Sequence, residues 1–225
     1  ESGEQRMSFV FDFLKYNTLY ERCVMASVAH AIMVGKYNLL SSEQSWDGFN
    51  YNFQNMEGIR GVISFAEGEY ICAIQNNEEC DESIEQHVPE ILSGANAKIM
   101  NLAKEEAVQY MLVNYNGKSV PFITSAFWGS GDTNYSNQSE EQLIKSSEKT
   151  IMPFLYSEDD AKKYWKNYYE MTDEQIELAE DIYQRRISVS GRLNLSINEV
   201  NKLKEWFDDI DECIESFQEL GIYLL

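Results

Sequence analysis

The chain has 225 residues and a mass of 26.1 kDa, and its 38 acidic and 18 basic residues give a formal net charge of −20. A hydrophobic content of 44% is enough to form a core and argues against disorder. The charge argues against a protein that neutralises phosphates or anionic lipid, because both tasks need a positive surface. We therefore expect a folded protein that binds neither nucleic acid nor a membrane directly.

The longest uncharged apolar stretch, Cys23 to Gly35, is too short to span a bilayer, which needs about 20 residues. It also lacks the basic flank and cleavage pattern of a secretory signal. The four cysteines are far apart and form no Cys-x-x-Cys pair, which suits a reducing compartment. These features predict a cytoplasmic protein.

In the first half of the chain, the hydrophobic period changes from helical to extended. Apolar residues spaced by three to five over residues 8–33 predict one long helix or two short ones. Alternation over residues 46–75, with turns at 57–58 and 67–68, predicts a three-stranded antiparallel meander. An acidic loop follows, and Pro89 suits the first position of the next helix.

The second half begins with one more hairpin and then reads as helix. Asn116-Gly117 is the dipeptide that most favours a tight hairpin turn, and the alternation over 122–128 predicts a further strand. Residues 129–137 read as a loop. Beyond residue 138, helix starts are predicted at hydroxyl residues that suit N-caps, three of them followed by Glu or Gln at the third position: Ser139, Ser157, Thr172 and Ser196.

The last predicted helix has an apolar seam over residues 200–217 that steps by three and four, as in helical bundles. The whole pattern predicts an α+β fold, in which an antiparallel meander and hairpin sheet is packed by helices and followed by a C-terminal helical block. We expect an α+β domain over residues 7–137 and a helical block over residues 138–225, packed together as one unit.

Residues suited to catalysis are few. His30 and His87 have no second ligand at metal-binding spacing, and Cys72 lies in a predicted strand, facing inward. The Gly-Ser-Gly-Asp run at 129–132 lacks the Lys-Ser/Thr of a phosphate-binding loop. We therefore predict no catalytic residue, no metal ion and no cofactor, and a binding protein in preference to an enzyme.

A basic and aromatic segment at residues 158–192 superficially resembles a nucleic-acid surface. Its six bases are outnumbered by nine acids, however, and its aromatic residues fall at the spacing of a helix's core face. The prediction for this segment is a packed helix.

Arg60 is the only Lys or Arg between Lys36 and Lys98. We expect it to pair with Asp47 or Glu57, although its planar guanidinium could instead hold an anionic ligand. An alternative site is therefore a ligand cleft on the meander face, lined by Trp46, Asp47, Asn50, Asn52 and Arg60.

The C-terminal segment carries the sharpest surface signal, because seven acids follow one another without a base: Glu205, Asp208, Asp209, Asp211, Glu212, Glu215 and Glu219. In one continuous helix these acids would repel one another and oppose the helix dipole. A second acidic group follows the meander and includes Glu78, Glu79, Asp81 and Glu82. We take both groups as the predicted partner-binding residues.

Concentrated negative charge steers and orients a cationic partner. The first hypothesis is a non-enzymatic protein that binds a basic protein. Immunity proteins and antitoxins of bacterial defence, and nucleic-acid-mimicking inhibitors of nucleases, would need this composition. The alternatives are a small-molecule binder or enzyme that uses the meander face, and a subunit of a larger, defence-type assembly. The sequence leaves the oligomeric state open.

Overall fold

The computed structural model describes residues 15–79, 84–147, 150 and 157–224, which divide into two compact units. The first unit takes residues 1–19 and 48–152, and the second takes residues 20–47 and 153–225. This division differs from the predicted boundary at residue 138, because residues 20–47 group with the C-terminal helices. The helix α1 (Tyr16–Met33) begins in the first unit and continues into the second.

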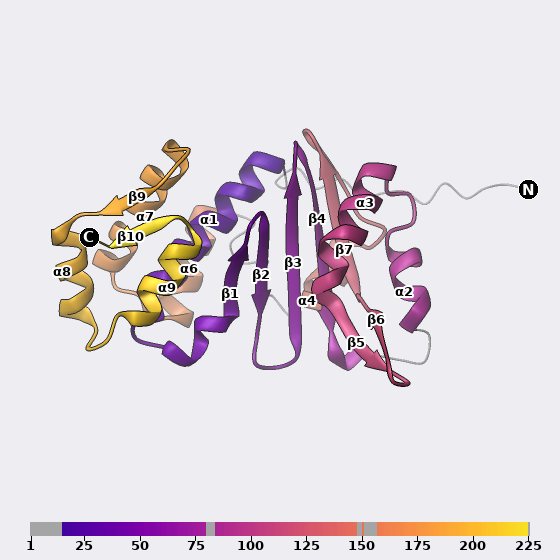
Figure 1. Ribbon diagram of the computed structural model, residues 1–225, viewed down its shortest axis with the longest axis horizontal. Helices are drawn as coiled ribbons and strands as arrows, with labels where there is room; N and C mark the ends of the chain where they lie inside the picture. Colours follow the sequence, from indigo (N-terminus) through magenta and orange to yellow (C-terminus); the bar gives the residue numbers. More distant parts are fainter. Residues whose placement is uncertain (1–14, 80–83, 148–149, 151–156, 225) are drawn as a thin grey trace, which may run out of the picture. The chain divides into compact units, whose positions relative to one another are not determined.

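An antiparallel sheet forms the centre of the first unit (Figure 1). Its strands lie in the order β2-β3-β4-β7-β8 and comprise β2 (Asn50–Gln54), β3 (Ile59–Ala66), β4 (Glu69–Asn76), β7 (Ser125–Ser130) and β8 (Thr133–Tyr135). The meander of β2, β3 and β4 is confirmed. The short strand β8 lies within the stretch that the sequence indicated as a loop, so that prediction was wrong there.

A separate hairpin joins β5 (Leu112–Tyr115) to β6 (Lys118–Pro121). Its two turn residues, Asn116 and Gly117, both have positive φ angles, of 52° and 78°. These are the backbone angles that make Asn-Gly the preferred two-residue hairpin turn, and they confirm the prediction.

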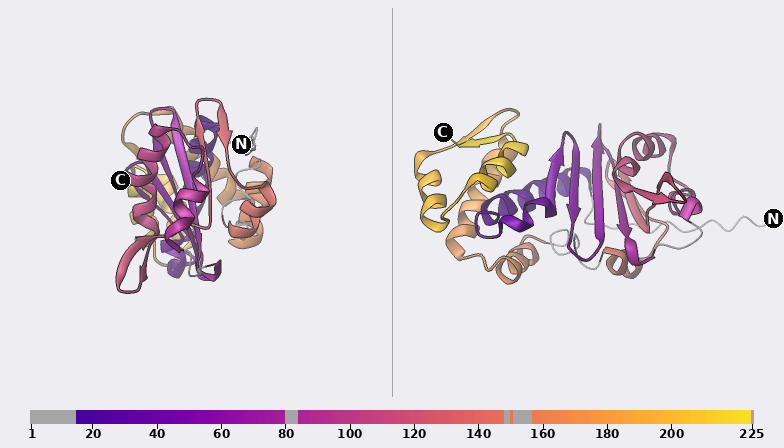
Figure 2. Two further views of the ribbon diagram at one scale, coloured as in Figure 1. Left: turned by 90° about the vertical axis from the view of Figure 1, so that its right-hand side faces the viewer. Right: turned by 60° about the horizontal axis from the view of Figure 1, so that its bottom comes forward.

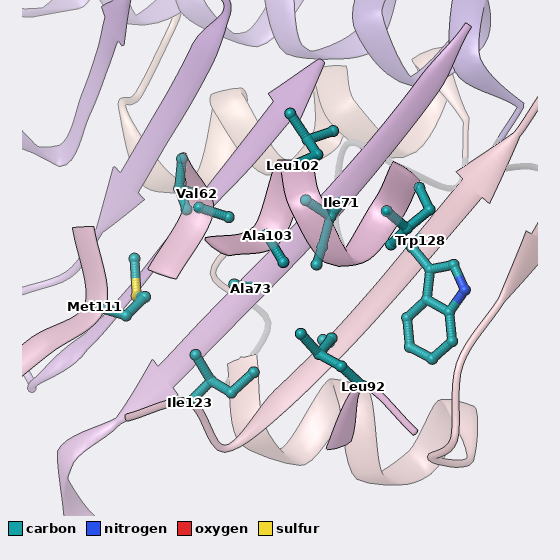
Figure 3. Packing of buried hydrophobic residues seen from close by; sticks show 12 residues of the cluster. Val62, Ile71, Ala73, Leu92, Leu102, Ala103, Met111, Ile123 and Trp128 are labelled. Carbon is teal, nitrogen blue, oxygen red and sulfur yellow. The ribbon is translucent and has the colours of Figure 1, made fainter. Parts of the chain in front are cut away.

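Both faces of the first unit's sheet are covered. Residues 61–65 of β3 and 70–76 of β4 are all buried, where the sequence had shown alternation. The helix α3 (Ala97–Glu105) packs on one face and α4 (Glu140–Ser147) on the other (Figure 2). Figure 3 shows the core beneath α3, where Leu102 and Ala103 face Ile71 of the sheet. A strand buried on both sides needs apolar residues at consecutive positions.

The first unit also contains three short helical segments: η2 (Asn77–Glu79), α2 (Ile84–Ile91) and η3 (Ala107–Met111). Pro89 lies inside α2 and not at the start of a helix, so its predicted position was wrong. The next helix, α3, begins instead at Asn96, whose side chain accepts a hydrogen bond from the backbone N–H of Ile99. Asn is among the strongest N-cap residues, and this cap fixes the start of α3.

The second unit is mainly helical. Besides most of α1, it contains η1 (Asn38–Glu43), β1 (Gln44–Asp47), α6 (Glu158–Tyr168), α7 (Asp173–Ser188), β9 (Leu193–Leu195), α8 (Ile197–Trp206), α9 (Asp211–Glu219) and β10 (Ile222–Leu224). The strands β9 and β10 pair in parallel. They lie within the stretch that the sequence predicted as helix to the end of the chain, so that prediction was wrong there. Each strand is stabilised by a partner strand that is distant in sequence.

Residues 23–33 of α1 are all buried. This explains the long apolar stretch, because a helix enclosed on every side is apolar around its whole circumference. In the described part of the chain, no helix has the length and apolar character to cross a membrane.

The predicted helix caps are all confirmed. The hydroxyls of Thr172 and Ser196 each accept from the backbone of the third helical residue, whose Gln or Glu side chain accepts from the backbone N–H of the cap. Ser139 and Gln142 form the same reciprocal pair, and Ser157 caps α6. These caps depend on residues three apart in sequence, so they could be predicted without tertiary information.

The predicted continuous C-terminal helix was wrong, because α8 ends at Trp206 and α9 begins at Asp211. Phe207 is extended, with φ −134° and ψ 137°, and the side chain of Asp209 accepts a hydrogen bond from the backbone N–H of Asp211. Short acidic side chains compete in this way with helical hydrogen bonds. Phe207 and Ile210 remain buried on either side of the break, so packing did not require one helix.

Candidate functional site

The carboxylates of the second unit fall into two groups that differ in their partners. Those from residue 158 to residue 199 are largely neutralised by lysine or arginine, as in the pairs Glu180 with Lys162 and Asp173 with Lys166. Within the described residues, none of the seven acids from Glu205 to Glu219 forms an ion pair. The acidic run predicted from sequence therefore keeps its charge unneutralised.

The break between α8 and α9 changes how these acids are held. Asp211 and Glu212 lie in the first turn of α9, where the helix dipole favours negative charge. The sequence predicted that these acids oppose the dipole of one long helix. Because the helix is broken, that prediction was wrong for Asp211 and Glu212. Glu219 is different, because its carboxylate accepts a hydrogen bond of 2.8 Å from the backbone N–H of Trp46, and burial raises its pKa. Residue 219 is exposed, but this hydrogen bond ties its carboxylate to β1.

We define the C-terminal acidic surface as the six remaining carboxylates, all exposed or half-exposed: Glu205, Asp208, Asp209, Asp211, Glu212 and Glu215. On α9, Asp211 and Glu215 are four residues apart and so project from the same side of the helix. Like charges at this spacing repel by a few tenths of a kcal/mol, a cost that a bound cation would relieve.

A hollow of about 240 Å³ lies between α7 and α8. Four carboxylates and one lysine line it, together with Leu178 and Asn198: Glu174, Glu177, Asp181, Glu199 and Lys202. The pKa of Lys202 is raised, first by its hydrogen bond with Glu174 and then by the charges of Glu174, Glu177 and Glu205. Lys202 is therefore influenced both by acids of α7 and by Glu205 of the C-terminal acidic surface.

The second predicted acidic group is described only in part. Glu78 is exposed, and Glu79 is half-buried and accepts a hydrogen bond from Ser146. Asp81 and Glu82 lie outside the described residues.

Most bases of α6 and α7 pair with carboxylates in the described chain, whereas Arg186 donates to the backbone carbonyl oxygens of Leu220 and Val189. Lys162, Lys163 and Lys166 each pair with a carboxylate, and Arg185 pairs with Asp181 and Glu199. Trp165 and Tyr169 are fully buried, as expected of the core face of a helix.

Buried polar groups of the second unit form a network around His30. Tyr169 Oη lies 2.9 Å from His30 Nδ1, and the carbonyl oxygen of Ser41 lies 3.3 Å from Nε2. Burial lowers the pKa of His30 to about 4, so the ring is neutral at pH 7. Nε2 then donates to Ser41 while Nδ1 accepts from Tyr169, which makes His30 a satisfied core residue, as predicted.

Glu43 is a buried carboxylate of the same unit, with both oxygens 2.8 Å from the hydroxyl of Tyr168. Burial raises its pKa, and the hydrogen bond from Tyr168 opposes that shift. Sequence reasoning missed this residue, because nothing local distinguishes it from the many exposed acids.

Cys72 is completely buried in β4, which raises the pKa of its thiol well above the ordinary value. A thiol in this state is a poor nucleophile. His87 packs its ring at 5.1 Å from Phe122. In the described residues, no three His, Cys, Asp or Glu side chains are grouped so that they could hold a metal ion.

The residues of the predicted ligand cleft are divided between the two units. Trp46 donates its indole N–H to Ser27 in the second unit, where Asp47 is exposed. In the first unit, Asn50 is buried and donates to Glu106 and to Tyr110.

Asn52 is half-buried, and Arg60 lines a hollow of its own. In the described chain, Arg60 makes no ion pair with Glu57, the predicted partner that lies in the same unit. Its Nε donates to Gln75, and its Nη2 donates to the carbonyl oxygen of Leu112 at 2.8 Å.

The hollow beside Arg60 has a volume of about 390 Å³ and lies at one end of the first unit's sheet. The β2–β3 turn, the end of β4 and the β5–β6 hairpin gather there (Figure 1). Besides Arg60, its lining consists of four side-chain amides and three small or apolar residues: Gln54, Asn55, Asn77, Asn114, Gly58, Ile59 and Val113. Burial lowers the pKa of Arg60, but an arginine stays charged at neutral pH.

Comparison of the chain with protein-family models, curated proteins and solved structures finds no match.

Proposed function

We propose that the protein binds a basic protein through the C-terminal acidic surface. The observation that carries this proposal is the contrast within the second unit, where acids up to residue 199 are largely in ion pairs and the run from 205 to 215 forms none among the described residues. Clustered charge of one sign raises the association rate of an oppositely charged partner and fixes its orientation. In the hollow between α7 and α8, Glu177 adds one more carboxylate that forms no ion pair within the described residues.

The finer form of the proposal is an inhibitor of the immunity or antitoxin type, which covers the positive nucleic-acid-binding surface of a nuclease. A formal net charge of −20 and unpaired carboxylates at the surface would imitate a phosphate backbone. The alternative of a subunit in a larger assembly needs another surface than the C-terminal seam, because Leu203, Phe207 and Phe217 are buried within this chain.

The test compares two variants with the same change in net charge. The acidic-surface variant carries Glu205→Gln, Asp208→Asn, Asp211→Asn and Glu215→Gln. The control variant carries Glu57→Gln, Glu67→Gln, Glu90→Gln and Glu105→Gln. All eight residues are exposed, and within the described chain none forms an ion pair. The four control substitutions lie in the first unit. Comparing the two variants therefore distinguishes an effect of where the charge is removed from an effect of how much net charge is removed.

Partners captured from a native lysate are identified and then measured as purified pairs. We expect a basic partner that binds the wild type and the control variant equally, and the acidic-surface variant at least about tenfold more weakly. Affinity should fall steeply between about 50 and about 500 mM salt, because salt screens surface charge. Equal binding by both variants, salt-independent binding, or the absence of any basic partner would contradict the proposal.

A further inference from the structure

The hollow beside Arg60 has a charge opposite to that of the rest of the molecule. Arg60 is the one charged residue in its lining, although the chain carries an excess of 20 negative charges. Two of the five guanidinium N–H groups donate to Gln75 and to the carbonyl of Leu112, which leaves three without a protein partner in the described chain. An unpaired guanidinium is suited to hold a carboxylate or a phosphate.

The guanidinium is held in place before any ligand arrives. Gln75, which is fully buried, donates its amide Nε2 to the carbonyl oxygens of Met111 and Phe122. Its remaining Oε1 therefore faces Arg60 as an acceptor. A donor that is already oriented loses little entropy on binding, which favours affinity.

Two of the amides that line the hollow have their oxygens engaged by turn backbone. Asn55 Oδ1 accepts from the backbone N–H groups of Glu57 and Ile59, and Asn114 Oδ1 accepts from the backbone N–H of Gly117. These hydrogen bonds orient both amides, and the NH₂ groups of Asn55 and Asn114 are the ends that can donate to an anionic ligand. Together with Arg60, they give a lining dominated by donors.

The volume and the composition of the lining limit the class of ligand. A volume of about 390 Å³ corresponds to about a dozen water molecules, more than inorganic phosphate requires. No aromatic residue lines the hollow, so there is no ring on which a nucleobase could stack. Amide side chains suit hydroxyl groups, which both donate and accept.

We propose that this hollow binds a small hydroxylated molecule that carries an oxyanion, of the sugar phosphate or sugar acid class, with Arg60 holding the oxyanion and Asn55 and Asn114 donating to it or to its hydroxyls. The site is distinct from the C-terminal acidic surface, and its test does not depend on a protein partner.

Calorimetric titration of the full chain with four probes tests the ligand class: glucose 6-phosphate, glucuronate, glucose and inorganic phosphate. We expect at least one of the two charged sugars to bind at least about tenfold more tightly than glucose and than phosphate, and the tighter of the two identifies the oxyanion. No binding of either charged sugar up to about 10 mM, or equal binding of glucose 6-phosphate, glucose and phosphate, would overturn the proposal.

Substitutions that keep the fold test the site itself. Asn55→Asp and Asn114→Asp each retain the oxygen that accepts from the turn backbone and replace the NH₂ donor by a negative charge. The control is Asn101→Asp, an exposed position of α3 outside the hollow with the same charge change. We expect each of the first two to weaken binding at least about tenfold, and the control to change it less than about twofold.

Arg60→Gln should abolish binding, and its unfolding curve shows whether the variant is folded. Wild-type affinity in both Asn55→Asp and Asn114→Asp would overturn the assignment, whatever the result for Arg60. The acidic-surface variant should bind the sugar as the wild type does, so failure of one proposal is distinguishable from failure of the other.

Discussion

In the first unit, aromatic rings lie across glycines of the neighbouring strand, whereas the second unit encloses a helix that carries polar groups into its core. Phe53 lies opposite Gly61, and Tyr70 lies opposite Gly129, in the registers of the sheet. In the second unit, His30 is buried in α1 and bonded on both ring nitrogens. These are two ways of filling a core: a ring that lies against glycine backbone in the sheet, and a buried polar side chain with both ring nitrogens bonded in α1.

The largest effect is expected from truncating the core of each unit. Trp165→Ala in the second unit and Phe127→Ala in the first remove fully buried aromatic side chains and should each cost about 3–5 kcal/mol of unfolding free energy. Urea denaturation followed by circular dichroism measures this loss. Lys163→Ala, an exposed change on the same helix as Trp165, should stay within about 0.5 kcal/mol. A much smaller loss for Trp165→Ala than for Phe127→Ala would mean that the helical core repacks to fill the cavity more readily than the core of the sheet does.

The buried His30 of the second unit predicts that the free energy of unfolding depends on pH. The folded pKa of about 4 is below the unfolded value near 6.5, so the unfolded state binds more protons between these values. His30 therefore lowers the free energy of unfolding as the pH falls through this window, by about 3 kcal/mol in all. Glu43 acts in the opposite direction, because its folded pKa is raised.

The difference between the wild type and His30→Gln isolates the contribution of His30. Urea unfolding of both proteins at pH 7, 6 and 5 should show a steeper loss of stability in the wild type. Parallel pH profiles would show that His30 titrates in the folded protein as it does in the unfolded chain, contrary to the buried network.

The smallest changes in unfolding free energy are expected from Gly→Ala substitutions at two positions, one in each unit. A Cβ on Gly61 would lie 2.1 Å from the ring of Phe53, so Gly61→Ala should cost about 1–3 kcal/mol through overpacking. A Cβ on Gly191 in the second unit would meet nothing within 4 Å, and Gly191→Ala should be neutral or stabilising by up to about 1 kcal/mol. Thermal unfolding of both variants measures the contrast. Equal melting temperatures would show that the ring of Phe53 moves aside without cost.

The features predicted correctly are those held together by neighbouring residues. The Asn116-Gly117 turn and the caps at Thr172 and Ser196 need only a few residues of chain to form, and all are present. The predicted continuity of the last helix failed, because the same apolar spacing buries Phe207 and Ile210 whether or not the helix breaks between them. Periodicity reports which side of the chain is buried, and not where the hydrogen bonds are interrupted.

The two candidate sites differ in how much the sequence reveals. The acids from Glu205 to Glu215 are visible as a run without a base. The environment of Arg60 is not, because its partners Gln75 and Leu112 come from a neighbouring strand and from a separate hairpin. The register that pairs Arg60 with Gln54 and Gln75 could have been derived from the meander.

By itself, the sequence determined the strands of the meander, the hairpin turn and the starts of α4, α6, α7 and α8, since each follows from side-chain period or from hydrogen bonds between near neighbours. Tertiary structure decided which charges are neutralised by residues distant in sequence. Lys162 reaches Glu180 and Lys202 reaches Glu174 only because helices are packed together, while the last acidic run and Arg60 are left without an opposite charge in the described chain. Ion pairs form between groups a few ångströms apart, and that proximity is a property of packing and not of order along the chain.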